Sequence, residues 1–433
     1  MMKQTEIGLI PDDWEVITIG EVYDFKNGLN KAKEFFGYGV PIINYTDVYN
    51  NKGITKDIIK GKVYLNKDEI KRFNTQKGDV FFTRTSETPD EVGLTSVLLE
   101  DIENCVFSGF ILRARPKKNL FDLCYCKYCF STNSIRNFII QNCTYTTRAL
   151  TNGTVLSKIY LPLPPLQEQQ RIAKALSDVD ALISTTEKLI QKKKNIKQGT
   201  MQNLLTGKKR LPGFSPQTKT PAYKQTELGL IPEDWDVMSL EEICKRITDG
   251  SHESPAEVEN GYYMPSVKDM SIRGFDFSEC KKISASDYQK LVQNGCKPEI
   301  GDVLIAKDGS ILKYSFAIEE EMNIVILSSI AILKPNTSFI DSSFLALYFQ
   351  QEDFIKSVID NNKTGTGVPR IVLTNFKKIN IVIPSKEEQT AIANVLSSMD
   401  KEIETLNIKL EKYRNLKTAM MQQLLTGKIR LVK

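Results

Sequence analysis

An internal duplication limits the possible folds of this chain more than any other feature. The segment KQTEIGLIPDDWEV, residues 3–16, recurs almost letter for letter as KQTELGLIPEDWDV, residues 224–237. The two tryptophans of the chain, Trp14 and Trp235, occupy equivalent positions in the two copies. Because a long repeat is usually one structural unit, the 433 residues predict two units of the same architecture rather than a single large core.

The similarity continues through each half and is strongest at its two ends. KGDVFFTRTS aligns with IGDVLIAKDGS, and ILRARP aligns with AILKP. Each half closes on a matching stretch that ends in LLTGKKRL or LLTGKIRL. A shared frame that carries two divergent middle parts is the simplest description.

The first part of each half alternates short apolar runs, such as VPIINYTDV and FSGFILRARP, with Gly, Asn and Asp turn residues. This alternation predicts the strands of a mixed α/β (α+β) domain with few long helices. We expect two such domains, at residues 1–161 and 224–383. A polar, proline-bearing linker at residues 211–223 separates the two halves.

The closing stretches have a different pattern, because their apolar residues recur at alternating steps of four and three. This heptad spacing predicts two long helices, within residues 162–210 and 384–433, that bury their seams in an antiparallel coiled coil. Such pairing would give the duplicated chain an approximate two-fold axis. Pairing of each helix with another protein is the alternative. The predicted seam residues are Ile172, Leu176, Val179, Ile183, Ile190, Ile392, Leu396, Met399, Ile403, Leu406 and Leu410.

Composition excludes several classes of site. The chain has one histidine, His252, whereas HExxH and Cys2His2 zinc sites need two. Eight cysteines are too few for a disulfide scaffold, and we interpret Cys124, Cys126 and Cys129 as small apolar helix residues rather than metal ligands. No apolar run is long enough to span a membrane, and the N-terminus lacks an apolar signal core, which predicts a cytoplasmic protein. A net charge of +5 permits DNA binding without demonstrating it.

Catalytic motifs are weak in this sequence. Phe35 to Gly39 fits F-x-G-x-G formally, but no apolar strand precedes it, and the chain has no [DN]-P-P-[YF] methyltransferase motif. A PD…DxK pattern at Pro11 to Lys26 has no counterpart in the second half, and no P-loop is present. We therefore expect a chain without catalytic residues, metal or cofactor of its own.

The whole set of repeated motifs resembles the specificity subunit of type I restriction-modification systems. The resemblance covers the full chain and rests on the two GLIP openings, GDVLIAKDGS, TGTGVPRIVLTNFKKINIVIPSKEEQTAIANVL and the LLTGKxRL endings. It implies that each domain is a target recognition domain that reads one half of a split, asymmetric DNA sequence. It also implies that the coiled coil sets the spacer and binds two modification (methyltransferase) subunits. Restriction subunits would complete the complex, and the partner subunits would use S-adenosylmethionine, ATP and Mg²⁺.

Candidate DNA contacts are basic and hydrogen-bonding residues at predicted strand ends, because such side chains bind phosphates and base edges. His252 lies in a DGxHxxP-like loop, which the resemblance places among these contacts. The first half lacks the TGTGVPR form and has YTTRALTNGTV instead. The candidates are Lys26, Arg84, Thr85, Ser86 and Arg148 in the first half, and Thr248, Ser251, His252, Lys307, Ser310 and Arg370 in the second.

Two other functions are compatible with the sequence. One is a coiled-coil adaptor with protein-binding heads, which would show no salt-dependent DNA binding. The other is part of a fused methyltransferase-specificity enzyme.

Overall fold

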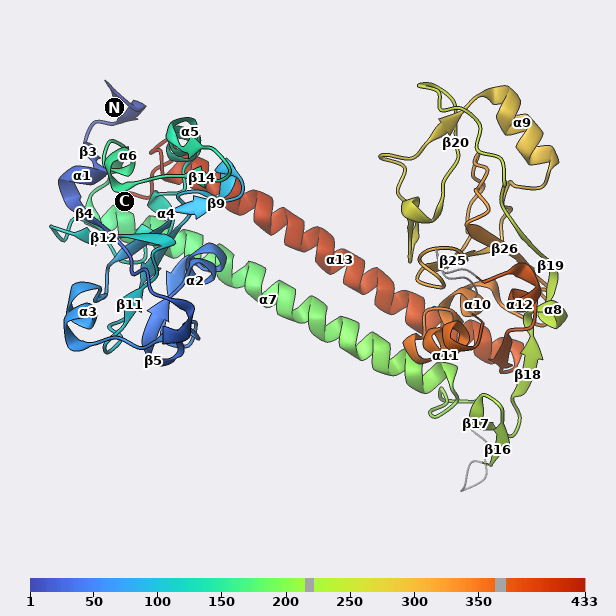
Figure 1. Ribbon diagram of the computed structural model, residues 1–433. Coiled ribbons are helices and arrows are strands. Elements are labelled where there is room, and N and C mark those ends of the chain that lie inside the picture. The colour runs from blue at the N-terminus through green and yellow to red at the C-terminus, as the bar shows by residue number, and fades with distance from the viewer. Residues whose placement is uncertain (215–221, 363–370, 433) are drawn as a thin grey trace. The chain divides into compact units, whose positions relative to one another are not determined.

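The computed structural model describes residues 1–214, 222–362 and 371–432. The chain forms two compact units, one from Met1–Glu187 with Ile408–Lys433 and the other from Lys188–Asn407. We call them unit 1 and unit 2 and describe each by itself. In Figure 1 the strands of unit 1 run from blue to teal and those of unit 2 from green to orange.

Unit 1 is built on a five-stranded sheet in the order β4-β12-β8-β10-β6. Its pairs are antiparallel except β10–β6. The three-stranded sheets β11-β5-β7 and β13-β14-β9 accompany it. The strands are β1 (Met2–Thr5), β2 (Gly8–Pro11), β3 (Glu15–Thr18), β4 (Tyr23–Asn27), β5 (Phe36–Ile43), β6 (Gly53–Ile54), β7 (Lys62–Val63), β8 (Val80–Thr83), β9 (Thr85–Ser86), β10 (Thr95–Leu98), β11 (Val106–Phe107), β12 (Ile111–Pro116), β13 (Thr144–Tyr145), β14 (Ala149–Leu150) and β15 (Tyr160–Leu163). The short helices are α1 (Ile19–Val22), α2 (Tyr45–Asn50), α3 (Lys67–Arg72), α4 (Cys126–Cys129), α5 (Asn133–Asn142) and α6 (Gly153–Leu156).

Unit 2 repeats this plan with a four-stranded antiparallel sheet in the order β19-β26-β24-β25. Its strands are β16 (Tyr223–Thr226), β17 (Gly229–Pro232), β18 (Asp236–Ser239), β19 (Cys244–Asp249), β20 (Tyr262–Tyr263), β21 (Met270–Ser271), β22 (Gly274–Phe275), β23 (Lys282–Ile283), β24 (Val303–Ala306), β25 (Ser315–Ala317), β26 (Ile330–Pro335) and β27 (Asn380–Ile383). Its short helices are α8 (Leu240–Ile243), α9 (Ala285–Gln293), α10 (Ser342–Tyr348), α11 (Glu352–Asn362) and α12 (Leu373–Lys377). The predicted mixed α/β class is confirmed.

The central strand of each unit is buried on both faces, which explains its continuous apolar run. In β8, Val80 and Phe82 pack in one core cluster while Phe81 packs in another. In β24, Val303 and Leu304 divide between two clusters in the same way. Alternate side chains of a strand point to opposite faces, so a run without polar residues belongs in the middle of the fold. Cys126 and Cys129 lie in the first of these clusters of unit 1, where a small apolar side chain fits.

Two long helices, α7 (Leu166–Leu205) and α13 (Lys386–Leu424), each contribute one end to each unit (Figure 1). Within the described ranges, no helix combines the length and the apolarity needed to cross a membrane. Gly207 and Gly427, with φ of 69° and 70°, follow the two helix ends, where a left-handed residue stops a helix.

Ion pairs show that the helices run antiparallel in both units. In unit 1, Asp180 pairs with Lys417 at 2.6 Å and Glu187 with Arg414 at 2.8 Å. In unit 2, Lys193 pairs with Glu402 and Lys197 with Asp400, both at 2.6 Å. The predicted seam residues that are buried are Ile172, Leu176, Val179, Ile190, Ile392, Leu396, Ile403 and Leu410, while Ile183, Met399 and Leu406 are partly buried. Lys193 and Lys197, which continue the alternating three-and-four spacing of the seam after Ile190, are thus matched by carboxylates on the facing helix.

A tryptophan, a glutamate and an arginine join the sheet side of each unit to its helix ends, and we call this contact the Trp–Glu–Arg latch. In unit 1, the Trp14 indole N–H donates to Glu168 at 2.9 Å. Arg430 donates to both carboxylate oxygens of Glu168, at 2.7 and 2.8 Å, and to both oxygens of Asp13. The hydrogen bonds to Glu168, and after them those to Asp13, raise the pKa of Arg430.

Unit 2 contains the same latch, built from Trp235, Glu388, Arg210 and Asp234. In both units, the arginine follows the long helix of the opposite sequence half. Arg430 closes the unit that holds Trp14, and Arg210 closes the unit that holds Trp235. Each latch therefore joins an arginine from the end of one sequence half to a tryptophan near the start of the other.

Candidate nucleic-acid interface

The small sheet β13-β14-β9 brings together candidate residues that lie some 60 positions apart in sequence. Ala149 pairs with Ser86 and Leu150 pairs with Thr85. Arg148 directly precedes β14 and is exposed, and Thr85 is partly exposed. This sheet therefore places an arginine and a hydroxyl on one accessible surface.

Arg84 lies where this sheet meets β12. Its N–H donates to the carbonyl of Phe110 at 3.0 Å, and its carbonyl accepts from Thr151 at 3.0 Å. Arg84 also lines a cavity of about 690 Å³ together with Lys26, Lys117 and Lys158. Asp24 lines the same cavity and pairs with Lys117 at 3.2 Å. Four cations against one carboxylate make this cavity a favourable place for a phosphate group.

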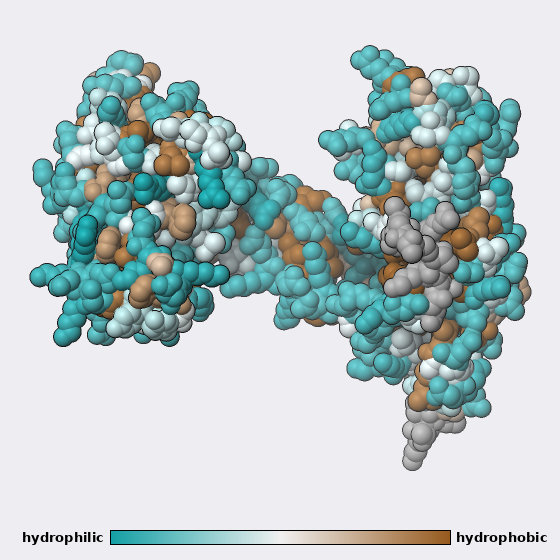
Figure 2. Space-filling model, viewed as in Figure 1, coloured by the Kyte–Doolittle hydropathy of each residue, from teal (hydrophilic) through white to brown (hydrophobic). Residues whose placement is uncertain are grey.

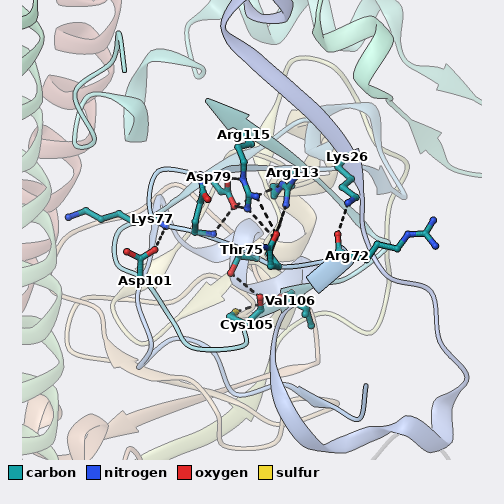
Figure 3. A network of polar contacts seen from close by, with 12 residues as sticks. Lys26, Arg72, Thr75, Lys77, Asp79, Asp101, Cys105, Val106, Arg113 and Arg115 are labelled. Carbon is teal, nitrogen blue, oxygen red and sulfur yellow. Dashed lines mark hydrogen bonds and ion pairs between the residues drawn. The ribbon is translucent and has the colours of Figure 1, made fainter. Parts of the chain in front are cut away.

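Lys26 has a structural partner as well. Its ammonium group donates to the carbonyl of Arg72 at 2.5 Å, at the C-terminal end of α3, where the helix dipole favours a cation. Burial first, and then the nearby Arg113, lowers the pKa of Lys26. Arg113 faces Lys26 across the β4–β12 ladder and donates to Asn74 at 2.7 Å. Figure 3 shows Lys26 and Arg113 within one polar network, in which Arg115 binds both oxygens of Asp79.

Ser86 points away from solvent. Its hydroxyl donates to the carboxylate of Glu91 and accepts from Tyr45 at 3.3 Å, and the residue is buried. It belongs to the support of the sheet rather than to its accessible surface.

In unit 2, the ends of β19 and β24 bring the corresponding candidates together. Lys307 is buried, and its ammonium group lies 3.0 Å from Asp308 and 3.6 Å from Asp249. His252 is exposed and its Nε2 lies 3.3 Å from the same Asp249 carboxylate. The Asp249 carboxylate therefore contacts both Lys307 and the exposed His252.

The other candidates of unit 2 differ in accessibility. Ser251 is buried, and its hydroxyl donates to the carbonyl of Glu253 at 2.8 Å. Thr248 and Ser310 are partly exposed. Arg370 lies outside the described residues.

Replacing Lys307 with methionine is expected to destabilise unit 2, because Asp308 and Asp249 would lose their buried cation and the side chain of Asp249 is only 11% exposed. A loss of about 3 kcal/mol in the free energy of unfolding is expected. Urea denaturation of a Trp14→Phe background, whose remaining tryptophan Trp235 reports on unit 2, measures it. Lys245→Ala is the contrasting variant, since this exposed side chain of unit 2 should change stability by no more than about 0.5 kcal/mol. A lysine that served as a phosphate contact alone would leave the stability of the Lys307→Met variant unchanged.

Exposed aromatic and basic residues around the unit 1 surface were not among the candidates predicted from the sequence. Phe110 and Tyr145 are more than half exposed although both adjoin candidate residues. Lys117 and Lys158 line the cavity beside Arg84. A sequence signal existed for Tyr145, which lies in the polar stretch TYTTR, but not for Phe110, which lies between Gly109 and Ile111.

Comparisons with known proteins agree on one family. The pattern of the type I restriction modification DNA specificity domain matches residues 11–198 and 232–412. The type I restriction enzyme MjaVIII specificity subunit of Methanocaldococcus jannaschii is 28% identical over 432 residues, which cover 98% of this chain and 94% of that protein.

Two solved structures share the fold. The type I restriction-modification S subunit from M. genitalium superposes with a TM-score of 0.54 at 17% identity and covers 95% of this chain and 96% of its own. A chain from work on the assembly and conformational transition of the type I R-M system gives a TM-score of 0.57 at 15% identity. The match covers 97% of this chain and 99% of that chain. The family pattern occurs twice and spans most of the sequence, once over each repeat. The chain therefore belongs to the type I restriction-modification DNA specificity family.

Proposed function

We propose that this chain is the DNA-reading, non-catalytic subunit of a methyltransferase and endonuclease complex, and that each unit reads one half of a split, asymmetric target. One observation carries the proposal. The strand that follows the shared GDV motif ends in both units beside polar residues, but the accessible residues there differ, Arg84 and Thr85 in unit 1 against Asp308 and Ser310 in unit 2. Equivalent positions with different side chains would read different bases.

The long helices supply the second part of the proposal, a docking surface for two modification subunits. Leu182, Leu189 and Ile196 recur every seven residues on α7 and are exposed beside the seam. Leu416 on α13 is exposed as well. Figure 2 shows apolar side chains on the exposed part of the long helices. A heptad stripe outside the seam suits further helices that pack alongside the pair.

Catalysis and its cofactors belong to the partners in this proposal. The modification subunits would use S-adenosylmethionine, and the restriction subunits would use ATP and Mg²⁺. Double-stranded DNA is the ligand of the present chain, and its phosphates would lie against basic surfaces such as the cavity of Arg84.

A domain exchange tests the proposal. Residues 17–158 are replaced with the corresponding segment of a relative that has a different target, and the chimera is expressed with its modification subunits. Because the two units read independently, methylome sequencing should show one changed half-site, with the other half-site and the spacer retained. A change in both half-sites would contradict independent reading, and the absence of salt-dependent DNA binding by the complex would favour the protein-binding adaptor.

A further inference from the structure

A bulge in unit 1 presents a tyrosine to solvent. Both Phe36 and Val40 of β5 pair with Val63 of β7, so residues 37–39 loop out of the ladder. Gly37 and Gly39 have φ of 103° and 96°, a conformation that residues with a side chain avoid. A Cβ atom on Gly39 would lie 2.4 Å from the carbonyl oxygen of Val63. The two glycines thus allow the bulge, and the bulge directs Tyr38 outward.

Tyr38 stacks on Tyr64 outside the sheet. Their ring centroids are 5.6 Å apart with planes at 27°, and the residues are 52% and 53% exposed. The N–H of Tyr64 donates to the carbonyl of Phe35 at 2.8 Å, which fixes the base of the pair. Phe36 adds a third exposed aromatic ring. Clustered exposed aromatic residues commonly mark a binding surface.

The charges around this pair favour a polyanion. Lys33, Lys60 and Lys62 are exposed and form no ion pair within the described part of the chain, while Glu34 is an exposed carboxylate among them. The hydroxyl groups of Tyr38 and Tyr64 make no hydrogen bond to any described residue.

A second tyrosine stack in unit 1 has a different character. Tyr45 and Tyr49 stack at 5.7 Å, but Tyr49 donates to Glu91 at 2.8 Å and Tyr45 donates to Ser86. That pair is held by its hydroxyl groups within the protein. The pair of Tyr38 and Tyr64, by contrast, is free to contact a ligand, and aromatic rings between lysines are typical of nucleic-acid surfaces.

We propose that Tyr38 and Tyr64 form a wedge that inserts at a base step of the half-site read by unit 1, while the neighbouring lysines bind the flanking phosphates. This inference rests on the proposed function and adds DNA distortion to it. A duplex offers no free base face, so insertion must partly unstack one step. Unit 2 has no matching wedge among its described residues. At β20, Tyr262 stacks on Tyr288 at 4.0 Å and Tyr263 packs near Phe277, and both tyrosines are partly buried.

The test uses the full chain in complex with its modification subunits. The probe is a duplex of the methylated target in which 2-aminopurine replaces one base at a time through each half-site. The wild-type complex should raise the fluorescence at one step in the half-site assigned to unit 1 by the domain exchange. Tyr38→Ala with Tyr64→Ala should abolish this rise and weaken binding roughly tenfold or more, since stacking on an aromatic ring contributes strongly to affinity.

Control variants separate the wedge from general damage. Tyr38→Phe with Tyr64→Phe should retain both the fluorescence rise and the affinity, because the rings remain. Tyr160→Ala, at an exposed tyrosine of β15, should behave as wild type.

Three results would overturn the inference in distinguishable ways. Unchanged binding and fluorescence in the double alanine variant would remove the wedge and leave the proposed function intact. Loss of the modification subunits from that variant in gel filtration would assign the tyrosines to a protein contact. Failure of the wild-type complex to bind its methylated target would refute the proposed function, and the wedge with it.

Discussion

Replacement of Arg430 with methionine is expected to lower the free energy of unfolding of unit 1 by about 3–5 kcal/mol. Arg430 is the cation that neutralises Glu168, whose side chain is 2% exposed. Without the guanidinium group, this carboxylate would retain a single described hydrogen bond, from Trp14. An unpaired buried charge is among the most destabilising changes that one substitution can produce.

The two tryptophans make this measurement specific to one unit. In a Trp235→Phe background, urea denaturation followed by fluorescence reports on Trp14 and hence on unit 1. Arg414→Met is the matched control, because Arg414 is half exposed and pairs with Glu187 and Glu411 at the helix surface. It should cost less than about 1 kcal/mol. Adding Glu168→Gln to Arg430→Met should restore part of the loss, and an equal loss in both arginine variants would contradict the role of the latch.

Replacement of Lys52 with methionine is expected to stabilise unit 1 at pH 7. Lys52 is partly buried beside the helix pair, and its ammonium group donates to Ser131 at 3.2 Å. Burial, followed by the charges of Lys417 and Arg136, lowers its pKa from 10.5 to about 8. A shift of this size corresponds to about 3–4 kcal/mol against folding while the lysine is protonated in both states.

The lowered pKa of Lys52 determines whether the stability of unit 1 rises or falls with pH. Between pH 8 and about 10.5 the unfolded chain binds a proton that the folded chain has released, so stability should rise with pH over this range. The methionine variant should lack that rise, and its advantage should disappear above about pH 10.5. Lys56→Met, at an exposed position of the same segment, should match the wild type at every pH. Destabilisation of the Lys52 variant at pH 7 would mean that attraction to Asp180 outweighs the cost of burial.

The repeat and the heptads predicted most of the architecture, because both depend on patterns that lie within one stretch of sequence. The seam from Ile392 to Leu410 keeps the same heptad spacing throughout, and the apolar run of β24 is continuous. The pairing of each latch arginine with the tryptophan of the other sequence half could not be predicted from such local patterns. Arg210 and Arg430 occupy equivalent places in equivalent motifs, so the sequence alone does not tell which tryptophan each arginine reaches.

The candidate interface was predictable in position but less so in its individual residues. Strand ends did bring Arg84, Thr85 and Arg148 together, as the polar pattern indicated. Lys307 and Ser86 turned out to be buried. Each contacts one near neighbour, Asp308 or Glu91, and one residue remote in sequence, Asp249 or Tyr45, and a local pattern does not reveal the remote contact. Tyr38 lies in the segment Phe35 to Gly39, where the sequence pattern indicates only a formal F-x-G-x-G motif, and its exposed stack depends on Tyr64, a residue remote in sequence.

The crossed latches also set an order for folding on the ribosome. Arg430 leaves the ribosome 262 residues after Glu168, which at about 10 residues per second is a delay of nearly half a minute. During that interval the carboxylate of Glu168 lacks its contact with Arg430, so the latch of unit 1 is incomplete while unit 2 is being synthesised. A chain cut short before Arg430 would keep this defect permanently, so a truncated product should be recognised by proteases. Completion of the first DNA-reading unit thus depends on translation of the second.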